Sequence, residues 1–311
     1  MNNDPLVSVI VPSYCHAPFI LECLQSIYDQ SYRNIELIVI DDLSNDNTMN
    51  IVSSILKTGF SKRFNNVILR QNTQNKGAHA SINHGITLSS GMYIAVINSD
   101  DLYAATRIER LMSAMTDAGS EIAFSLVNVF SNEEEDADSG GDEYPHNFLL
   151  FPLRQRMEIA RDPTVSFSLL RSNVATSTGN LLFSRALYDK VGPFLPLKYC
   201  HDWDFILQSC FYTEPEVVLE PLYHYRLHGS NSFASLAHVA GLESEVVFRR
   251  FMRRGIRGES ANRLFPSAKN WPGYFELFLQ QIDKTRFFER EAGMGESSWR
   301  TYEKTRLSQF I

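Results

Sequence analysis

The chain has 311 residues, of which 44% are hydrophobic and 21% charged, and its formal net charge is −7 at pH 7. It is long enough to bury a full core, and its composition is that of a globular protein and not of a disordered chain. Because nucleic-acid binding requires a basic face, the negative net charge argues against nucleic acid as the main partner.

The sequence also bears on cellular location. It contains no run of about 18 consecutive apolar residues, so we expect no transmembrane helix. The N-terminus lacks the basic and apolar segments of a secretory signal. The four cysteines show no metal-type CxxC spacing, which favours a reducing compartment. We therefore expect a cytoplasmic protein.

The first 130 residues alternate between short apolar runs and amphipathic helical runs. The apolar runs predict strands at residues 7–11, 36–40, 67–69, 93–97 and 122–130. The amphipathic runs predict helices at residues 19–30, 47–56, 78–88 and 105–118. Such repeated strand–helix units predict an α/β fold, with a mostly parallel, Rossmann-like sheet flanked by helices.

The rest of the chain is mixed and then helical. The acidic residues within 131–146 precede Ser139-Gly140-Gly141 and predict a solvated loop. Beyond it we expect a helix at 152–160, a strand or turn at 180–183, a helix from Asp202 and a strand at 217–225. From about residue 235 the pattern is helical. We therefore divide the chain into a main domain, 1–232, and a helical C-terminal extension, 233–311.

The extension carries a cluster of five arginines, Arg249, Arg250, Arg253, Arg254 and Arg257. Such a cluster is typical of a solvated helix face. The alternative is a contact with an anionic membrane surface, which would place the protein peripherally at the inner face of the membrane.

Three predicted strands end in polar groups. The first ends in Pro12-Ser13-Tyr14, the second in Asp41-Asp42 and the fourth in Asn98-Ser99-Asp100-Asp101. The carboxyl ends of parallel strands share one edge of the sheet, where open α/β folds bind ligands. Carboxylate, amide and hydroxyl oxygens are the ligands that Mg²⁺ or Mn²⁺ prefers. For Asp101, a helix N-cap is the alternative interpretation.

These groups suit a nucleotide. Tyr14 would stack on a base, Asp41 would accept a hydrogen bond from a base or ribose, and Asp100 would hold a metal on a diphosphate. Neither a G-x-G-x-x-G fingerprint after the first strand nor a P-loop motif is present. A metal would therefore have to neutralise the phosphates.

A series of motifs, in order along the chain, resembles those of family 2 glycosyltransferases. They are Val7–Tyr14, Ile38–Thr48, Asn75-Lys76-Gly77, Asn83-His84-Gly85, Asn98–Asp101, Thr178-Gly179-Asn180, Gly192-Pro193-Phe194, His201–Asp204 and Tyr225–Ser230. The resemblance spans about residues 6–232, and residues beyond about 240 match no motif.

The resemblance implies a GT-A fold and an inverting, metal-dependent glycosyltransferase of the hexosyltransferase type. The implied donor is a nucleoside-diphosphate sugar, and the implied acceptor is a hydroxyl of a glycan or glycolipid in polysaccharide biosynthesis. Residues 1–232 would then be the catalytic domain, with a donor half at 1–130 and an acceptor half at 147–232.

The resemblance also implies roles for single residues. Pro12, Tyr14 and Asp41 would line the nucleoside pocket. Asp100 would bind Mn²⁺ or Mg²⁺ on the donor diphosphate. Asp202 would be the catalytic base, and a helix N-cap is its alternative role.

The chain departs from the family pattern at two positions. Asn98 stands where the family often has Asp. This difference removes one negative charge but keeps an oxygen atom that can contact the nucleotide-sugar donor. His201 stands where Glu is common. Both Asp100 and Asp202 are retained, so the expected activity is not excluded.

Three further residues have two interpretations each. Lys76 would contact the diphosphate or be solvated. Arg226 would pair with a phosphate or brace a carboxylate. His228 would be a metal or diphosphate contact, or a polar loop residue. No spacing to a partner assigns a role to four other histidines, His16, His79, His84 and His224.

Two other functions compete with sugar transfer. A nucleotidyltransferase would need a basic residue near the first strand, and residues 12–19 contain no Lys or Arg. A non-catalytic scaffold or carbohydrate-binding protein with the same fold is supported only by Asn98. Nucleotide release from sugar nucleotides would separate the three.

Overall fold

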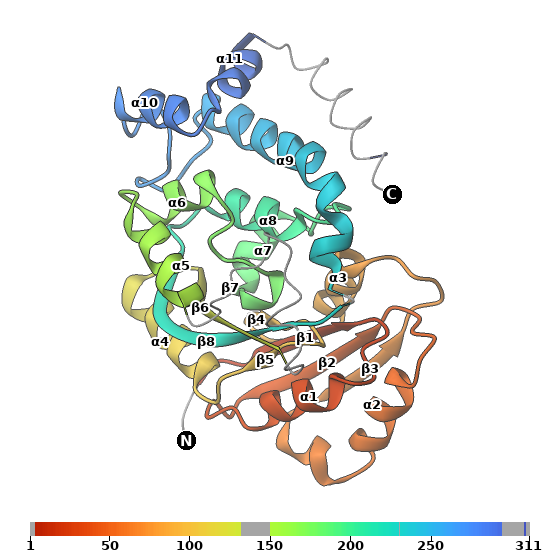
Figure 1. Ribbon diagram of the computed structural model, residues 1–311. Helices are drawn as coiled ribbons and strands as arrows, with labels where there is room; N and C mark the ends of the chain where they lie inside the picture. The colour runs from red at the N-terminus through yellow and green to blue at the C-terminus, as the bar shows by residue number, and fades with distance from the viewer. Residues whose placement is uncertain (1–3, 132–149, 230, 294–307, 309–311) are drawn as a thin grey trace.

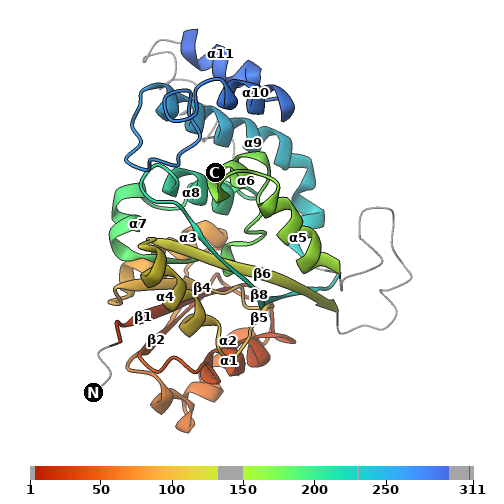
Figure 2. The same ribbon diagram turned by 90° about the vertical axis from the view of Figure 1, so that its left-hand side faces the viewer.

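The computed structural model describes residues 4–131, 150–229, 231–293 and 308. Within them an eight-stranded mixed sheet runs in the order β3-β2-β1-β4-β7-β6-β8-β5, with helices on both faces (Figures 1 and 2). The expected α/β fold is thus confirmed. The predicted acidic loop within 131–146 lies almost wholly outside the described residues.

The first half of the sheet is parallel, as the sequence predicts. Its strands are β1 (Val7–Ser13), β2 (Ile35–Asp41), β3 (Val67–Gln71) and β4 (Tyr93–Val96). The helices of this half are α1 (Ile20–Tyr28), α2 (Thr48–Leu56), α3 (Ala78–Leu88) and α4 (Arg107–Ala118). Gly119 ends α4 in the left-handed conformation that glycine adopts without steric cost.

The second half of the sheet is mixed. Its strands are β5 (Leu102–Tyr103), β6 (Ile122–Ser131), β7 (Leu182–Ser184) and β8 (Glu216–Leu227). Strand β7 lies between β4 and β6 and is antiparallel to both, whereas β8 runs parallel to β6. The two predicted halves of the main domain therefore share one sheet.

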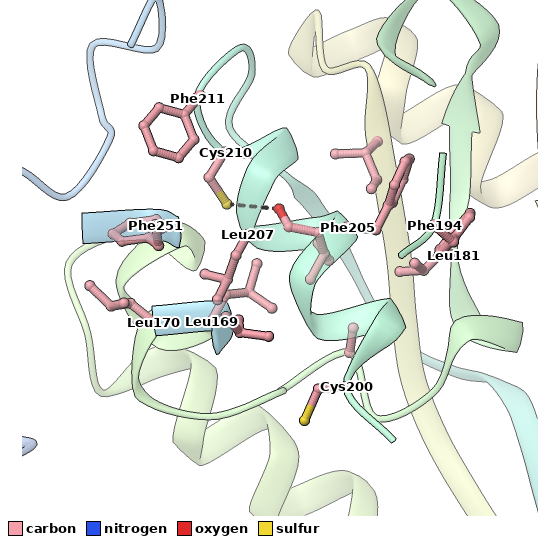
Figure 3. Packing of buried hydrophobic residues seen from close by; sticks show 14 of the residues in the cluster. Leu169, Leu170, Leu181, Phe194, Cys200, Phe205, Leu207, Cys210, Phe211 and Phe251 are labelled. Atoms are coloured by element: carbon pink, nitrogen blue, oxygen red, sulfur yellow. Dashed lines mark hydrogen bonds between the residues drawn. The ribbon is translucent and has the colours of Figure 1, made fainter. Parts of the chain in front are cut away.

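Alternating side chains of β1 fill cores on both faces of the sheet. Val7, Val9 and Val11 pack toward α1 and α4, while Ile10 belongs to the opposite core with α3. That second core also takes α6 (Val165–Arg171), α7 (Arg185–Val191) and α8 (His201–Ser209). Figure 3 shows its centre, where Phe205 of α8 packs against Phe194. The sequence did not predict α6 or α7, because seven residues give too short a periodic signal.

The C-terminal region is helical, as expected. Its helices are α9 (Ser232–Ile256), α10 (Tyr274–Gln281) and α11 (Thr285–Gly293). Within the described part of the chain, no helix is both long and apolar enough to cross a bilayer.

The interpretation of the arginine cluster as a solvated face is wrong for most of its members. Arg249 is fully buried and pairs with Glu291 of α11, and Arg250 pairs with Asp204 of α8. Arg254 lies over the ring of Phe211. The reason is tertiary: α9 packs between α8 and α11, whose acidic and aromatic residues meet its basic side. The proposed membrane contact through this helix thus loses most of the residues on which it was based.

Candidate functional site

The structure brings the three polar strand ends together at one edge of the sheet. Ser13 at the end of β1 lies opposite Asp41 at the end of β2, and the Asn98–Asp101 turn follows β4 beside them. Pro12 is buried within β1, whereas Tyr14 beyond its end is 45% exposed. A ligand at this edge can therefore reach the Tyr14 ring.

Both carboxylates after β2 are buried and organise the neighbouring loops. Asp41 accepts hydrogen bonds from the Ser44 hydroxyl at 2.6 Å and from the Gln71 amide at 2.8 Å. Asp42 accepts the backbone N–H groups of Lys76 and Gly77. Asp42 thus fixes the backbone of Lys76, whose side chain is exposed at the same edge.

Asp100 lies in a cluster with two histidines. Its Oδ2 atom is 3.1 Å from Nε2 of His228 and 3.7 Å from Nε2 of His16. The three groups can offer ligand atoms that all lie within 4.8 Å of one another. His228 follows β8 and His16 follows β1, so two distant strands bring the imidazoles to the Asp100 turn.

The electrostatics and hydrogen bonding of this cluster suit a divalent cation. Burial lowers the pKa of His16, which favours the neutral imidazole that metal binding requires. Burial alone would raise the pKa of Asp100, but the hydrogen bond with His228 and the nearby imidazoles lower it overall. Among the described residues, Oδ1 of Asp100 is buried without a hydrogen-bond partner. The Ser99 hydroxyl lies 2.7 Å from Nδ1 of His16 and orients the ring.

Asp101 does not cap a helix, so that alternative is wrong: α4 begins only at Arg107. Its carboxylate points into the protein and accepts hydrogen bonds from the Tyr223 hydroxyl and the backbone N–H of Arg226. Burial, and then the charge of Asp100, raise the pKa of Asp101 well above its usual value. Asp101 therefore joins the Asp100 turn to β8.

Of the two interpretations of Arg226, the geometry favours the one in which its side chain braces a carboxylate. Its guanidinium is buried between the rings of Phe19 and Phe130. It donates to the backbone oxygen of Asp100 at 2.8 Å and to the Glu22 carboxylate at 2.7 Å. The side chain thus holds the Asp100 turn from behind.

Asp202 lies in the first turn of α8, which begins at His201 and has Cys200 as its N-cap. Its carboxylate is buried and accepts hydrogen bonds from the Asn173 amide at 3.1 Å and from the backbone N–H of Trp203 at 2.7 Å. Burial raises its pKa to about 6, against an ordinary value near 4. Such a carboxylate is ionised at neutral pH and is a stronger base than an exposed one.

The start of α8 is held by the C-terminal region. Glu243 of α9 is fully buried, and its carboxylate accepts the backbone N–H groups of Lys198, Tyr199 and Cys200 at 2.7–2.8 Å. The sequence reasoning missed Glu243, because nothing in its helical surroundings distinguishes it from Glu245.

A turn joins the Asp100 cluster to Asp202. The Asn98 amide donates to the Ser177 hydroxyl at 3.0 Å, and the adjacent Thr178 hydroxyl lies 2.9 Å from Nε2 of His201. A Cβ atom on Gly179 would lie 1.9 Å from the Tyr223 hydroxyl, so only glycine fits there. Burial lowers the pKa of His201 to about 4, so this histidine is neutral at physiological pH.

Comparison with known proteins gives a consistent result. The family model "Glycosyl transferase family 2" matches residues 8–191, more than half of the chain. An uncharacterized glycosyltransferase of Rickettsia typhi is 29% identical over 71% of this chain, and the match spans 65% of that relative, less than two thirds of its length. The glycosyltransferase GlyG of Streptococcus pneumoniae is 31% identical over 43% of this chain and 42% of its own.

Two solved structures share the fold. TarS 1-349 of S. aureus, in complex with UDP-GlcNAc, superposes with a TM-score of 0.65 over 91% of this chain and 72% of its own, at 17% identity. The mannosyltransferase PcManGT of Pyrobaculum calidifontis, in complex with GDP-Man and Mn²⁺, superposes with a TM-score of 0.60 over 100% of this chain and 86% of its own, also at 17% identity. These likenesses confirm the expected GT-A fold.

Proposed function

The chain belongs to glycosyl transferase family 2, and from this premise we propose that it transfers a sugar from a nucleoside-diphosphate donor to an acceptor hydroxyl. One observation carries the proposal. Asp202 is a buried carboxylate with a pKa of about 6, and the adjacent His201 contacts the Ser177–Thr178 turn, which in turn contacts Asn98 beside the candidate metal cluster of Asp100. A general base and a metal site are the two parts that the reaction needs.

We propose that Asp100, His16 and His228 hold a divalent cation. Mg²⁺ prefers a set of oxygen ligands, whereas two imidazoles and one carboxylate suit Mn²⁺ better. The Mn²⁺ bound in the mannosyltransferase structure supports this choice. When bound, the cation would neutralise the leaving diphosphate as a Lewis acid.

The exposed Tyr14 ring, Asp41 and Lys76 would receive the nucleotide. Each carboxylate oxygen has two acceptor sites, and Oδ1 of Asp41 uses one of them for Ser44. Among the described residues no second hydrogen bond reaches this oxygen, so its other site would accept a base or ribose donor. The UDP-GlcNAc and GDP-Man complexes of the two solved structures support a nucleotide-sugar donor, and Pro12 would shape the floor of this pocket as part of β1.

Asp202 would remove the proton of the attacking hydroxyl. Its oxygens accept from Trp203 and Asn173, and a carboxylate has further acceptor sites that could take a substrate proton. Direct attack on the face opposite the leaving diphosphate gives inversion at the anomeric carbon. Inversion, a hexose donor and a glycan or glycolipid acceptor also belong to the proposal, because the family resemblance implies them. We propose that the protein acts in the cytoplasm, as the cysteine pattern suggests.

The departure at Asn98 has a structural reason. Its amide donates to the Asp101 carboxyl group at 3.2 Å and to Ser177 at 3.0 Å, two hydrogen bonds that an ionised aspartate at this position could not donate. Asn98 therefore supports the turn that carries Asp100. This structural role supports a catalytic protein as well as it supports a non-catalytic scaffold, so Asn98 does not favour the scaffold.

The test is nucleotide release from a panel of UDP- and GDP-sugars, with Mn²⁺, with Mg²⁺ and with EDTA, in the wild type and in Asp202→Asn. We expect metal-dependent release that Asp202→Asn loses. NMR of the anomeric proton of the product reports inversion or retention. Pyrophosphate formation would instead support a nucleotidyltransferase, and no turnover with any donor would contradict the proposal.

A further inference from the structure

Helix α5 (Phe151–Ala160) has one face fixed firmly against the protein. Gln155 is buried, accepts the backbone N–H of Val127 at 2.7 Å and donates to the backbone oxygen of Val174 at 2.8 Å. Phe151 packs against the core that contains Val7, Val9 and Val11, and Ile159 packs against the opposite core; both lie on the Gln155 side of the helix. These contacts determine which side of the helix faces outward.

The outward face of α5 is apolar. Leu150, Leu153 and Met157 are 39%, 53% and 65% exposed. At 3.6 residues per turn they form a stripe about 60° wide, on the side of the helix away from Gln155. Surface helices of globular proteins normally carry polar residues there. Figure 2 shows α5 at the outside of the molecule, beyond β6 and β8.

Basic residues border this stripe. Arg154 and Arg161 lie along one side of it and Arg156 along the other, and all three are exposed. Glu158 is the single acidic residue of the helix. This arrangement is the reverse of α9, whose arginines are mostly buried against acidic partners.

We propose that the outward face of α5 lies on an anionic lipid bilayer. The leucine and methionine side chains would enter the boundary between headgroups and acyl chains, and the arginines would extend to the lipid phosphates. The charge of the border selects this occupant, because an apolar stripe flanked by arginines matches a negative surface with an apolar interior.

The position of α5 connects this surface with the site. Gln155 bonds to the backbone of Val174, and the preceding residue, Asn173, donates to Asp202. A lipid-linked acceptor would thus be presented close to Asp202. This consequence depends on the proposed function, whereas membrane binding can be measured without turnover, so the two can fail separately.

The experiment is vesicle flotation of the full chain, with phosphatidylcholine alone and with phosphatidylcholine mixed with phosphatidylglycerol. We expect binding only to the mixed vesicles, and weaker binding at high salt. Leu153→Ser with Met157→Ser should weaken binding at least about tenfold. Each Arg→Ser change at 154, 156 or 161 should weaken it about fivefold.

The matched control is Leu277→Ser in α10, which is 65% exposed, like Met157, and should bind normally. Thermal unfolding of each variant verifies that it is folded. Absence of wild-type binding to anionic vesicles, or binding unaffected by the double substitution, overturns the proposal. It is also overturned if the wild type is a dimer in sedimentation and the double variant is a monomer, because α5 then joins two copies of the chain.

Discussion

The Asp100 side and the Asp202 side of the site are held in different ways. Asp100 follows β4, Tyr14 follows the adjacent strand β1, and Asp41 ends β2 beyond it, so the sheet itself places these residues. Asp202 depends on a helix whose start is fixed by Glu243 of the C-terminal region. The polar residues at a sheet edge can thus be predicted from the residues that directly follow each strand. The residue that fixes the start of α8 lies far away in the sequence and cannot be predicted in this way.

The largest expected effect is on the Asp202 side. Asp202→Asn removes the proposed base and should lower kcat by about 10²–10⁴. The KM of the donor should change little, because the substitution leaves the Asp100 cluster intact. Asp189→Asn, which changes an exposed acid of α7, is the control. Near-normal kcat in Asp202→Asn would assign the base to another group.

The next largest effect concerns Mn²⁺ binding on the Asp100 side. His16→Ala removes one of the three candidate ligands and should weaken Mn²⁺ binding at least about tenfold, measured by calorimetry without substrate. His228→Ala should do the same, and the exposed His238→Ala should not. Unchanged Mn²⁺ affinity in His16→Ala would restrict the metal site to Asp100 and His228.

The third prediction concerns the stability of the protein and separates the Asp202 side from the Asp100 side of the site. Glu243→Ala leaves three backbone N–H groups without their acceptor, and each buried, unsatisfied group costs about 1–3 kcal/mol. We expect a lower free energy of unfolding in urea and a lower kcat, with Mn²⁺ affinity retained. Glu289→Ala, at an exposed acid of α11, is the control. An equal loss of Mn²⁺ affinity would show that the two sides do not respond separately.

The smallest effect is a shift in pH dependence. Because Asp202 must be ionised to act and its pKa is about 6, kcat/KM should fall as the pH drops below about 6. Burial is the main cause of the raised pKa, and the negative charge of Glu243 adds to it. Glu243→Gln should therefore move the acidic limb to lower pH. A limb that stays in place or moves to higher pH would contradict this coupling.

The parallel strands and their polar ends could be predicted because both signals are local. Apolar runs of strand length end abruptly in side chains such as Asp41 and Asp100. His16 could not be assigned, because its partner is 84 positions away and no spacing connects them. The burial of Arg249 could not be predicted for the same reason. The basic residues spaced along its helix resemble a solvated face, and its partner Glu291 reaches it only through tertiary packing.

Strand β7 has a consequence for folding during synthesis. It lies between β4 and β6 although it follows both along the chain. The position between these two strands therefore stays empty until Ser184 has left the ribosome. Until then β4 and β6 present unpaired edges, which are templates for aggregation. Pairing over such sequence distances is slow. The nascent chain should therefore depend on chaperones most strongly during the interval between the synthesis of β6 and that of β7.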